Sequence, residues 1–243
     1  MKKFTKMWAI AACALFAGTA AVNAEDYTWK FVTAGDATTY AIRSDGSLWS
    51  WGWNEKGQGG NGVSERTATP TLADGNRVWK KAVGGKAYGF FLAEDGSLWA
   101  AGTHEGGVQG TNDGIDHKVL TRIGTDNDWA DMACSRFWGY SGFAIKTNGT
   151  LWAWGKNSAG QLGIGNTQAQ TAPVQVGADM DWKQVAAGCS SVLALKTDGS
   201  LWGWGFNMYS ELFGHEGKQL SPVRLGSETD WEQVVVIDFR AYA

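Results

Sequence analysis

The chain has 243 residues, including 34 glycines, 15 tryptophans and only three prolines. A hydrophobic content of 44% supplies enough apolar side chain for a core, which excludes an intrinsically disordered chain. The glycines follow no triplet period, which excludes a collagen-like rod. Tryptophan at this density must be mostly buried, because its large indole is costly to leave in water.

The first 24 residues have the pattern of a secretory signal peptide. Three lysines precede an uncharged apolar run, and Val22 and Ala24 place small residues where a signal peptidase cleaves. We expect cleavage after Ala24 and an exported protein, periplasmic or extracellular in a bacterium. Two alternatives stay open: an uncleaved membrane anchor over residues 7–24, and a lipoprotein attached at Cys13.

Removal of this leader makes the chain more acidic. It takes away three lysines and no acid, so 18 basic residues face 24 acidic ones and the net charge is −6. Phosphate groups repel such a chain. We therefore expect no nucleic-acid partner and, after cleavage, no membrane partner.

Two cysteines follow the leader, Cys134 and Cys189. In an oxidising compartment they can form a disulfide. They can equally serve as two small buried apolar side chains, and their spacing does not decide between these alternatives.

The dominant signal is an internal repeat of about 50 residues, a period typical of solenoids and propellers. Leu-Trp recurs four times, and a second series of tryptophans recurs in the same phase. The structural tryptophans predicted by these two series are Trp29, Trp49, Trp79, Trp99, Trp129, Trp152, Trp182, Trp202 and Trp231. The repeats span residues 29–78, 79–128, 129–181 and 182–230, with a partial repeat at 231–243.

Each repeat has a strand-like pattern. Two apolar runs flank an Asp-Gly or Asn-Gly dipeptide, at Asp45, Asp95, Asn148 and Asp198. This pattern predicts a hairpin with a two-residue type I′ turn. Since no stretch has a sustained helical period, we expect an all-β propeller whose tryptophans fill the space between blades. Replacing one of them by alanine should cost roughly 3–5 kcal/mol.

The third and fourth repeats carry a more specific motif. Residues 151–163 read L-W-A-W-G-K-N-S-A-G-Q-L-G, and residues 201–207 read L-W-G-W-G-F-N. These runs resemble the regulator-of-chromosome-condensation repeat, in which W-G-x-N-x-x-G-Q-L-G is followed by a Pro-Val strand. Pro173-Val174 and Pro222-Val223 supply that strand. The resemblance extends over residues 29–243 and implies a β-propeller.

The number of repeats departs from this family, whose members typically close a ring of seven blades. The chain offers four full repeats and a partial fifth that begins at Trp231. Three explanations stay open: a fragment, a closed ring of four blades, or a partial ring completed by a second copy in a homo-oligomer. An open ring would expose strand edges and a tryptophan-rich blade face.

Catalytic and metal-binding patterns are missing from the sequence. His104, His117 and His215 lack the spacing of metal ligands, and His104 occupies a slot held by asparagine in the other repeats. The acidic residues at 126–131 lack the glycine and glutamate of an EF-hand and are typical of a solvated turn. We therefore expect no enzyme activity, no metal and no cofactor.

Two tryptophans of the mature chain lie off the repeat pattern, Trp53 and Trp138. Trp138 falls in a stretch that is three residues longer than its counterparts. Aromatic side chains beside an arginine on a scaffolded loop are typical of binding hot spots, although they can also pack over an irregular blade edge. The candidate partner-binding residues are Trp53, Arg136, Phe137, Trp138, Tyr140 and Tyr209.

These observations favour an exported, non-catalytic module that binds another protein through its propeller loops. The resemblance implies the same, since some family members are exchange factors for small GTPases and some are secreted β-lactamase inhibitors. Exchange activity is not expected of an exported chain, whereas an inhibitor-type binder fits export. Two alternatives stay open: a carbohydrate or small-molecule binder or hydrolase with an acid pair in the channel, and a self-assembling structural surface protein.

Overall fold

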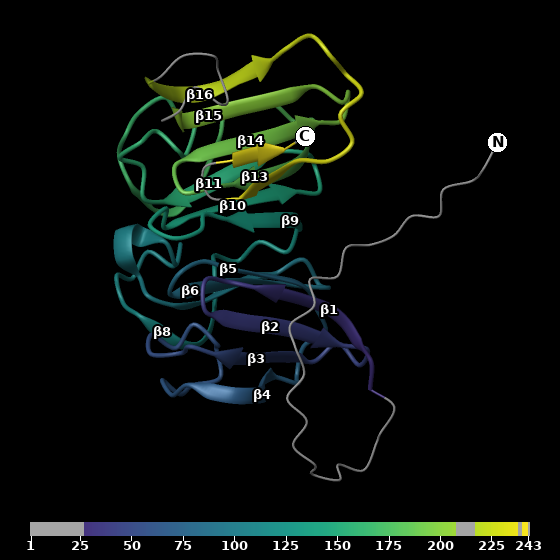
Figure 1. Ribbon diagram of the computed structural model, residues 1–243, viewed down its shortest axis with the longest axis vertical. Coiled ribbons are helices and arrows are strands. Elements are labelled where there is room, and N and C mark those ends of the chain that lie inside the picture. The colour runs from purple at the N-terminus through teal and green to yellow at the C-terminus, as the bar shows by residue number, and fades with distance from the viewer. Residues whose placement is uncertain (1–26, 208–216, 238–239, 243) are drawn as a thin grey trace, which may run out of the picture.

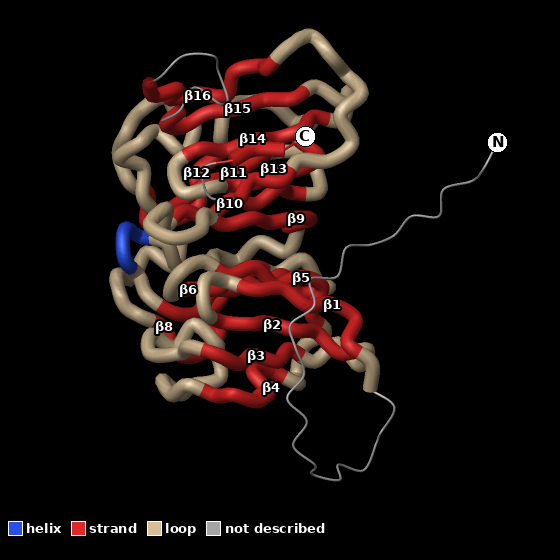
Figure 2. The backbone as a smooth tube through the Cα atoms, viewed as in Figure 1, coloured by secondary structure: helices blue, strands red, loops and turns tan. Residues whose placement is uncertain are grey.

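A computed structural model describes residues 27–207, 217–237 and 240–242 of the chain. The predicted signal peptide, Tyr209 and His215 lie outside the described residues. Within them the fold is all-β, apart from the short 3-10 turn η1 (Glu105–Gly107). The described part contains no helix long and apolar enough to cross a membrane. The strands form separate small sheets stacked one after another along the molecule (Figures 1 and 2).

Four of these sheets have four antiparallel strands each, and a fifth has two. The first sheet contains β1 (Trp29–Ala34), β2 (Thr38–Arg43), β3 (Leu48–Gly52) and β4 (Thr67–Asp74). The second contains β5 (Trp79–Gly84), β6 (Tyr88–Ala93), β7 (Leu98–Gly102) and β8 (His117–Arg122). The third contains β9 (Trp129–Cys134), β10 (Ser141–Lys146), β11 (Leu151–Gly155) and β12 (Gln170–Gln175). The fourth contains β13 (Trp182–Ala187), β14 (Ser191–Lys196), β15 (Leu201–Asn207) and β16 (Gly217–Leu225), and the fifth contains β17 (Val235–Ile237) and β18 (Arg240–Tyr242).

The predicted hairpins are confirmed, but their predicted turn type is wrong. A type I′ turn needs positive φ at both central residues, whereas at Asp45-Gly46 only the glycine has it, at 86°. The amide of Gly46 donates a hydrogen bond to the carbonyl of Arg43, and the amide of Arg43 donates one to the carbonyl of Ser47. This is the pattern of a three-residue loop that ends in a left-handed glycine. Asp45 does not have the positive φ of the left-handed region, because its carboxylate accepts hydrogen bonds from the amide and the hydroxyl of Ser47.

The same turn stabilises the tryptophan that follows it. Ser47 Oγ accepts a hydrogen bond of 2.8 Å from the indole nitrogen of Trp49, so the carboxylate, hydroxyl and indole form a chain. The other three hairpins repeat it with closely similar distances, at residues 95–99, 148–152 and 198–202. The recurring run, D-G-S-L-W in three repeats and N-G-T-L-W in the third, is therefore a hydrogen-bonded unit.

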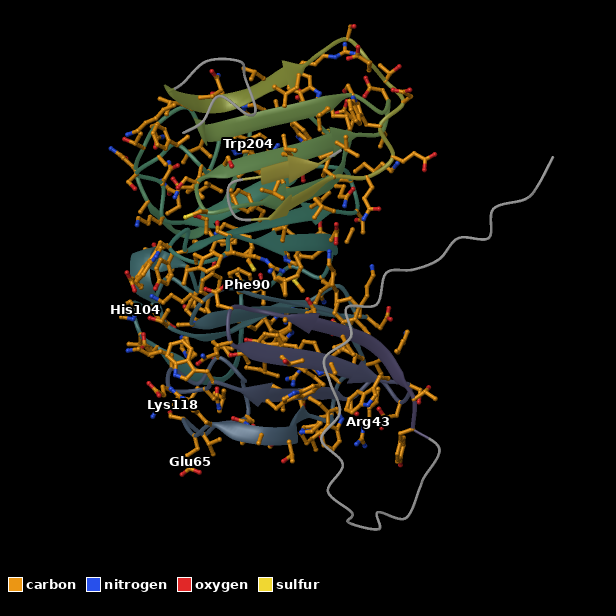
Figure 3. The ribbon with its side chains drawn as sticks, in the orientation of Figure 1. Arg43, Glu65, Phe90, His104, Lys118 and Trp204 are labelled. Atoms are coloured by element: carbon orange, nitrogen blue, oxygen red, sulfur yellow. The ribbon has the colours of Figure 1, made fainter. Side chains whose placement is uncertain are left out.

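Each four-stranded sheet has two different faces. On its tryptophan face, the tryptophan that begins the first strand packs edge-to-face on the tryptophan of the Leu-Trp pair in the third strand. In the third sheet, the ring centres of Trp129 and Trp152 lie 6.0 Å apart. Its aliphatic face carries the leucine and isoleucine positions. Phe90, labelled in Figure 3, lies on the aliphatic face of the second sheet. At the junction with the third sheet its ring centre lies 5.2 Å from that of Trp154 on the tryptophan face. Tryptophan thus fills the space between blades, as expected.

The sheets follow an arc that is open in the described structure. First strands lie next to one another, with β1 beside β5, β5 beside β9, β9 beside β13, and β13 beside β17 (Figure 1). The aliphatic face of the first sheet covers the second, but no described sheet covers the tryptophan face of the first. The expectation that the repeat tryptophans are buried is therefore wrong for Trp29, which is substantially exposed.

Candidate functional site

The longer loops gather at one rim of the arc. At this rim lie the turns that join the first strand of each sheet to its second strand, and the loops that follow the third strand. The backbone ties these two segments together, since the amide of Trp53 bonds to Ala37 and that of Lys156 bonds to Tyr140. We call this edge the loop rim; it comprises residues 35–37, 53–66, 85–87, 103–116, 135–140, 156–169 and 188–190.

Asparagines of the repeat motif fix the long loops of this rim. Asn157 Oδ1 accepts a bond of 2.9 Å from the amide of Leu162, while its Nδ2 donates to the carbonyl of Gln168 at 3.0 Å. Asn54 closes the loop of the first repeat in the same way. These hydrogen bonds therefore hold each long loop in one conformation.

Histidine replaces asparagine in the second repeat. His104 Nδ1 lies 2.7 Å from Asp116 Oδ1, and its amide donates to the same oxygen at 2.9 Å. His117 pairs with Asp113 at 2.8 Å. Both histidines thus hold loop carboxylates, and the described residues contain no group of three His, Cys, Asp or Glu side chains that could hold a metal ion.

The loop at 135–140, which carries four of the six candidate residues, exposes two aromatic rings. Trp138 is 61% exposed and Phe137 is 42% exposed. Phe137 and Tyr140 also have positive φ, at 49° and 46°, an uncommon conformation for residues other than glycine. Strained backbone of this kind persists only where surrounding structure enforces it.

Contacts with three other sheets enforce this conformation. The ammonium of Lys86 lies 3.1 Å from the ring centre of Trp138, and the amide of Phe137 lies 3.5 Å from Asp36 Oδ1. Gly139 packs so closely that an added Cβ would lie 2.6 Å from the carbonyl oxygen of Cys189. The 135–140 loop thus touches the corresponding turns of the first, second and fourth sheets.

The other described candidate residues differ in how they are placed. Tyr140 is buried against Tyr88, at 5.9 Å between ring centres, so its expected role in contacting a partner is wrong: its left-handed backbone turns the ring inward. Burial, together with the nearby Glu105 carboxylate, raises the pKa of Tyr140 to about 12. Trp53 is half-buried and flanks the same Ala37 turn that lies next to Asp36, so the structure brings it near the 135–140 loop.

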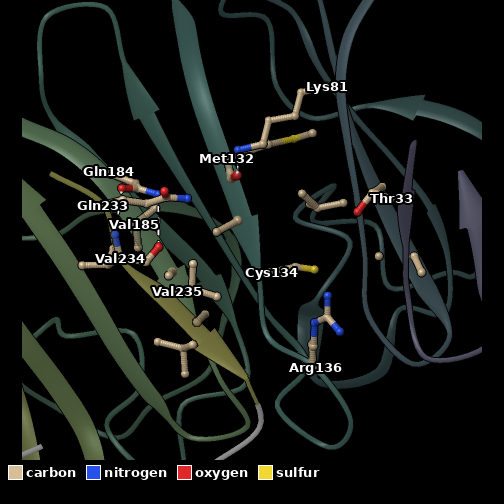
Figure 4. Close-up of a pocket in the computed structure, with 17 residues that line it drawn as sticks. Thr33, Lys81, Met132, Cys134, Arg136, Gln184, Val185, Gln233, Val234 and Val235 are labelled. Carbon is tan, nitrogen blue, oxygen red and sulfur yellow. Dashed lines mark hydrogen bonds between the residues drawn. The ribbon is translucent and has the colours of Figure 1, made fainter. Parts of the chain in front are cut away.

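Arg136 lines a cavity of about 190 Å³ on the concave side of the arc (Figure 4). The inner strands β1, β5, β9 and β13 line it, together with residues 233–236. Lys81 also faces this cavity, but its ammonium is held by Asp131 at 2.5 Å and by the carbonyl of Met132 at 2.9 Å. The described residues that line the cavity include no carboxylate. No pattern in the amino-acid sequence predicted this cavity.

Cys134 and Cys189 are free and buried, so the alternative of a disulfide is wrong for this structure. Cys134 ends β9, whereas Cys189 lies in the turn after β13 of the next sheet. Burial raises the pKa of the Cys134 thiol to about 12. They therefore behave as small apolar side chains.

The acidic residues at 126–131 form ion pairs. Asp126 and Asp128 hold the ammonium of Lys146 at 2.6 and 3.0 Å. Lys146 in turn lies over the rings of Trp129 and Trp152. Asp179, Asp181 and Lys196 repeat this arrangement in the fourth sheet. The turn is solvated, as expected, since the side chains of Asp126 and Asp128 are 49% and 45% exposed, and these ion pairs also anchor it.

Comparison with known proteins identifies the repeats. Residues 45–92 and 148–195 match the regulator of chromosome condensation (RCC1) repeat, and residues 29–58 match a second description of the same repeat. The chain is 30% identical to the ultraviolet-B receptor UVR8 of Arabidopsis thaliana over 163 residues, and 27% identical to Protein RCC2 of Homo sapiens over 150 residues. These matches cover 66% and 60% of the chain, but only 37% and 19% of the two relatives.

Solved structures show the same fold. Human WBSCR16 superposes with a TM-score of 0.76 at 21% identity, over 88% of this chain and 56% of that one. Yeast RCC1 (Prp20), in its complex with Kap60, also gives 0.76 at 21% identity, over 90% of this chain and 54% of that one. The chain thus spans about half of each of these propellers. The sequence matches and the superpositions agree: residues 29–92 and 148–195 are repeats of the regulator of chromosome condensation (RCC1) type, in a chain with the fold of these proteins.

Proposed function

We propose that the chain is an exported, non-catalytic module that binds another protein through its loop rim, in the manner of a secreted inhibitor. The observation that carries this proposal is the exposure of Phe137 and Trp138 on a loop held by three neighbouring sheets. Large rigid aromatics carry much of the binding energy in protein interfaces. Because the loop is already fixed, little conformational entropy is lost when a partner binds.

The relatives support a protein partner. One solved structure shows yeast RCC1 (Prp20) bound to Kap60, and another concerns the binding of Prp20p to Gsp1p and histones. Those partners belong to those proteins. For this chain they support only the general mode, in which a protein of this fold binds another protein.

The concave cavity does not favour the alternative of a glycoside hydrolase. Such enzymes need two carboxyl groups flanking the scissile bond, and the described lining offers Arg136 and Lys81 instead. Its volume of about 190 Å³ is also below the roughly 300–1,000 Å³ typical of small-molecule sites.

Export rests on the N-terminal sequence, which has the charge and apolar pattern of a leader. An exported chain meets other exported proteins. The partner is therefore sought among periplasmic or extracellular proteins.

The experiment compares three forms of the purified protein as bait in a periplasmic extract: wild type, Trp138→Ala and Met180→Ala. Met180 is a matched control because it is as exposed as Trp138, at 61%, but lies outside the loop rim. We expect Trp138→Ala to lose a partner that wild type and the control retain, and calorimetry with that partner to show at least about tenfold weaker binding. Equal capture by all three forms would exclude the 135–140 loop as the binding site.

A further inference from the structure

Two lysines of the described structure lie over tryptophan rings and are also held by carboxylates. Lys146 lies 4.9 and 5.1 Å from the ring centres of Trp129 and Trp152. Two aspartates hold the same ammonium, at 2.6 and 3.0 Å. Lys196 repeats this arrangement in the fourth sheet, again with two tryptophans and two aspartates. The recurring unit is therefore a carboxylate, an ammonium and an indole, in which the carboxylate neutralises the charge that the ring attracts.

A third lysine lies over a tryptophan ring but has no carboxylate. Lys86, in the turn between β5 and β6, places its ammonium 3.1 Å from the ring centre of Trp138. This ammonium forms neither an ion pair nor a hydrogen bond with the described part of the chain. Both residues belong to the loop rim, where Trp138 is largely exposed. The unit at the rim therefore has the ammonium and the indole of the other two, but not the carboxylate.

Two more cations at the 135–140 loop have no carboxylate partner among the described residues. The ammonium of Lys156 lies 3.5 Å from the carbonyl oxygen of Trp138, and Arg136 lies two positions before it on the same loop. The other basic side chains of the rim are paired, as Lys56 is with a carboxylate at 3.6 Å. The unpaired positive charge of the described rim is thus concentrated around this one loop.

Two carboxylates also lie at the 135–140 loop, but neither occupies the missing place. Asp36 Oδ1 lies 3.5 Å from the amide of Phe137, and the Glu105 carboxylate lies near the hydroxyl of Tyr140. Neither forms an ion pair with Lys86, which is half-buried. A half-buried ammonium gains more from a counterion than one in open water, because the effective dielectric constant around it is lower. The rim unit therefore favours a further carboxylate.

We propose that the partner places the carboxylate of an aspartate or glutamate beside the Lys86 ammonium and so completes the unit on Trp138. The partner surface is acidic at this point and apolar around it, because Phe137 is exposed as well. The two neighbouring cations extend the positive surface for further acidic side chains. This inference rests on the proposed function, in which this loop contacts another protein, and it names the chemistry of that partner.

The charge of the whole chain favours a protein over a nucleic acid or an anionic membrane. The chain has a formal net charge of −3 at pH 7, so it repels a ligand that carries many phosphates over a long surface. At physiological salt, charges more than about 8 Å apart are largely screened. A single carboxylate at the 135–140 loop therefore interacts mainly with the local cations.

The first experiment selects a phage-displayed library of random short peptides against three immobilised forms of the purified protein. These are wild type, Lys86→Gln/Lys156→Gln, and the control Lys183→Gln, which removes an exposed lysine of β13 outside the loop rim. Peptides enriched on wild type and on the control should be rich in aspartate and glutamate, and should bind the double variant at least about tenfold more weakly. Enrichment of peptides without acidic residues, no enrichment at all, or equal binding to all three forms would overturn the inference.

Two further variants separate this inference from the proposed function and from a merely structural effect. Trp138→Ala should lose the enriched peptides, and if it retained them the loop would be excluded as the binding surface, and the proposed function with it. If Trp138→Ala lost them but they were not acidic, the proposed function would stand and only the carboxylate would be wrong. Lys86→Arg/Lys156→Arg keeps both charges and should bind as wild type does, so weaker binding there would contradict the role of charge.

The second experiment needs no variant of the protein. Fluorescence anisotropy compares the most enriched acidic peptide with the same peptide in which every carboxyl group is replaced by its amide. The amide form should bind at least about tenfold more weakly, and the affinity of the acidic form should fall as salt rises. Labelled single-stranded DNA and phosphatidylglycerol vesicles are the competing probes. Equal binding of the two peptides, or tighter binding of DNA or vesicles than of the acidic peptide, would overturn the assignment of an acidic protein surface.

Discussion

The indole nitrogen of Trp154 donates a hydrogen bond of 2.8 Å to the carbonyl oxygen of Val108, which lies in the loop of the preceding sheet. Trp204 repeats this bond with Gln161 at the same distance. Both tryptophans are fully buried, so each bond lies in the space between two blades. One residue therefore fills the junction and ties it to the neighbouring loop.

Trp154→Ala should destabilise the fold by roughly 3–5 kcal/mol, because it leaves a cavity and an unpaired carbonyl at Val108. Trp51 is the matched control, since it occupies the same motif position in the first sheet but is only half-buried and has no described sheet before it. We expect Trp51→Ala to cost about 1–2 kcal/mol. Urea unfolding followed by far-ultraviolet circular dichroism measures both, and equal losses would contradict the proposed role of the junction.

The hairpin aspartates should make stability depend on acidic pH. Hydrogen bonds from the hydroxyl and then the amide of Ser97 lower the pKa of Asp95 from its ordinary value of 3.8. The ionised form is thus favoured by folding, so its contribution is present above the ordinary pKa and is lost as pH falls through the lower pKa of the folded protein.

The third hairpin has Asn148 in this place, whose amide oxygen accepts the same bonds without titrating. Asp95→Asn should therefore lose less stability than wild type between about pH 6 and about pH 3, and Asn148→Asp should lose more. Unfolding free energies measured by urea titration at several pH values provide the test. If the unfolding free energy of Asp95→Asn depended on pH as strongly as that of wild type, this role of the aspartate would be excluded.

The two buried thiols should be inert in the folded protein. Burial raises the pKa of Cys134 to about 12, which leaves almost no reactive thiolate at neutral pH. We expect slow reaction with Ellman's reagent in native buffer. In denaturant without reductant, the part of the chain after the leader should react rapidly with two equivalents. Fewer than two reactive thiols in denaturant would indicate a disulfide between Cys134 and Cys189, which are free in the structure.

The leader should be removed when the full chain is expressed in a bacterium. We expect the N-terminal sequence of the exported protein to begin at Glu25. Ala24→Leu should block cleavage and leave the longer precursor, whereas Asn23→Ala, one residue away, should not. Recovery of the uncleaved wild type in the membrane fraction would favour the anchor instead.

Local signals were enough to predict the strands and hairpins. The D-G-S-L-W run contains its own hydrogen-bond acceptors and donors, so Asp45, Ser47 and Trp49 interact within five residues of sequence. The turn type was mispredicted because the preference of Asp-Gly for type I′ competes with the bonds that the carboxylate makes to Ser47. That competition depends on backbone geometry, which a dipeptide frequency does not describe.

Positions within the loop at 135–140 were predicted only in part. Its extra length and aromatic content singled out Trp138, but nothing in the local sequence distinguishes the exposed Phe137 from the buried Tyr140. Their difference arises from Lys86, Asp36 and Tyr88, which belong to other repeats.

The amino-acid sequence by itself determined the period, the strands, the hairpin sites and the two series of tryptophans, because each of these depends on residues close together in the chain. Tertiary structure decided which tryptophan is covered and that Arg136 lines the cavity. Trp29 and Trp79 occupy equivalent repeat positions and differ in exposure because a described sheet covers Trp79 and none covers Trp29. The burial of a side chain depends on the sheet that lies across the junction, and the residues of that sheet are about 50 positions away in the sequence.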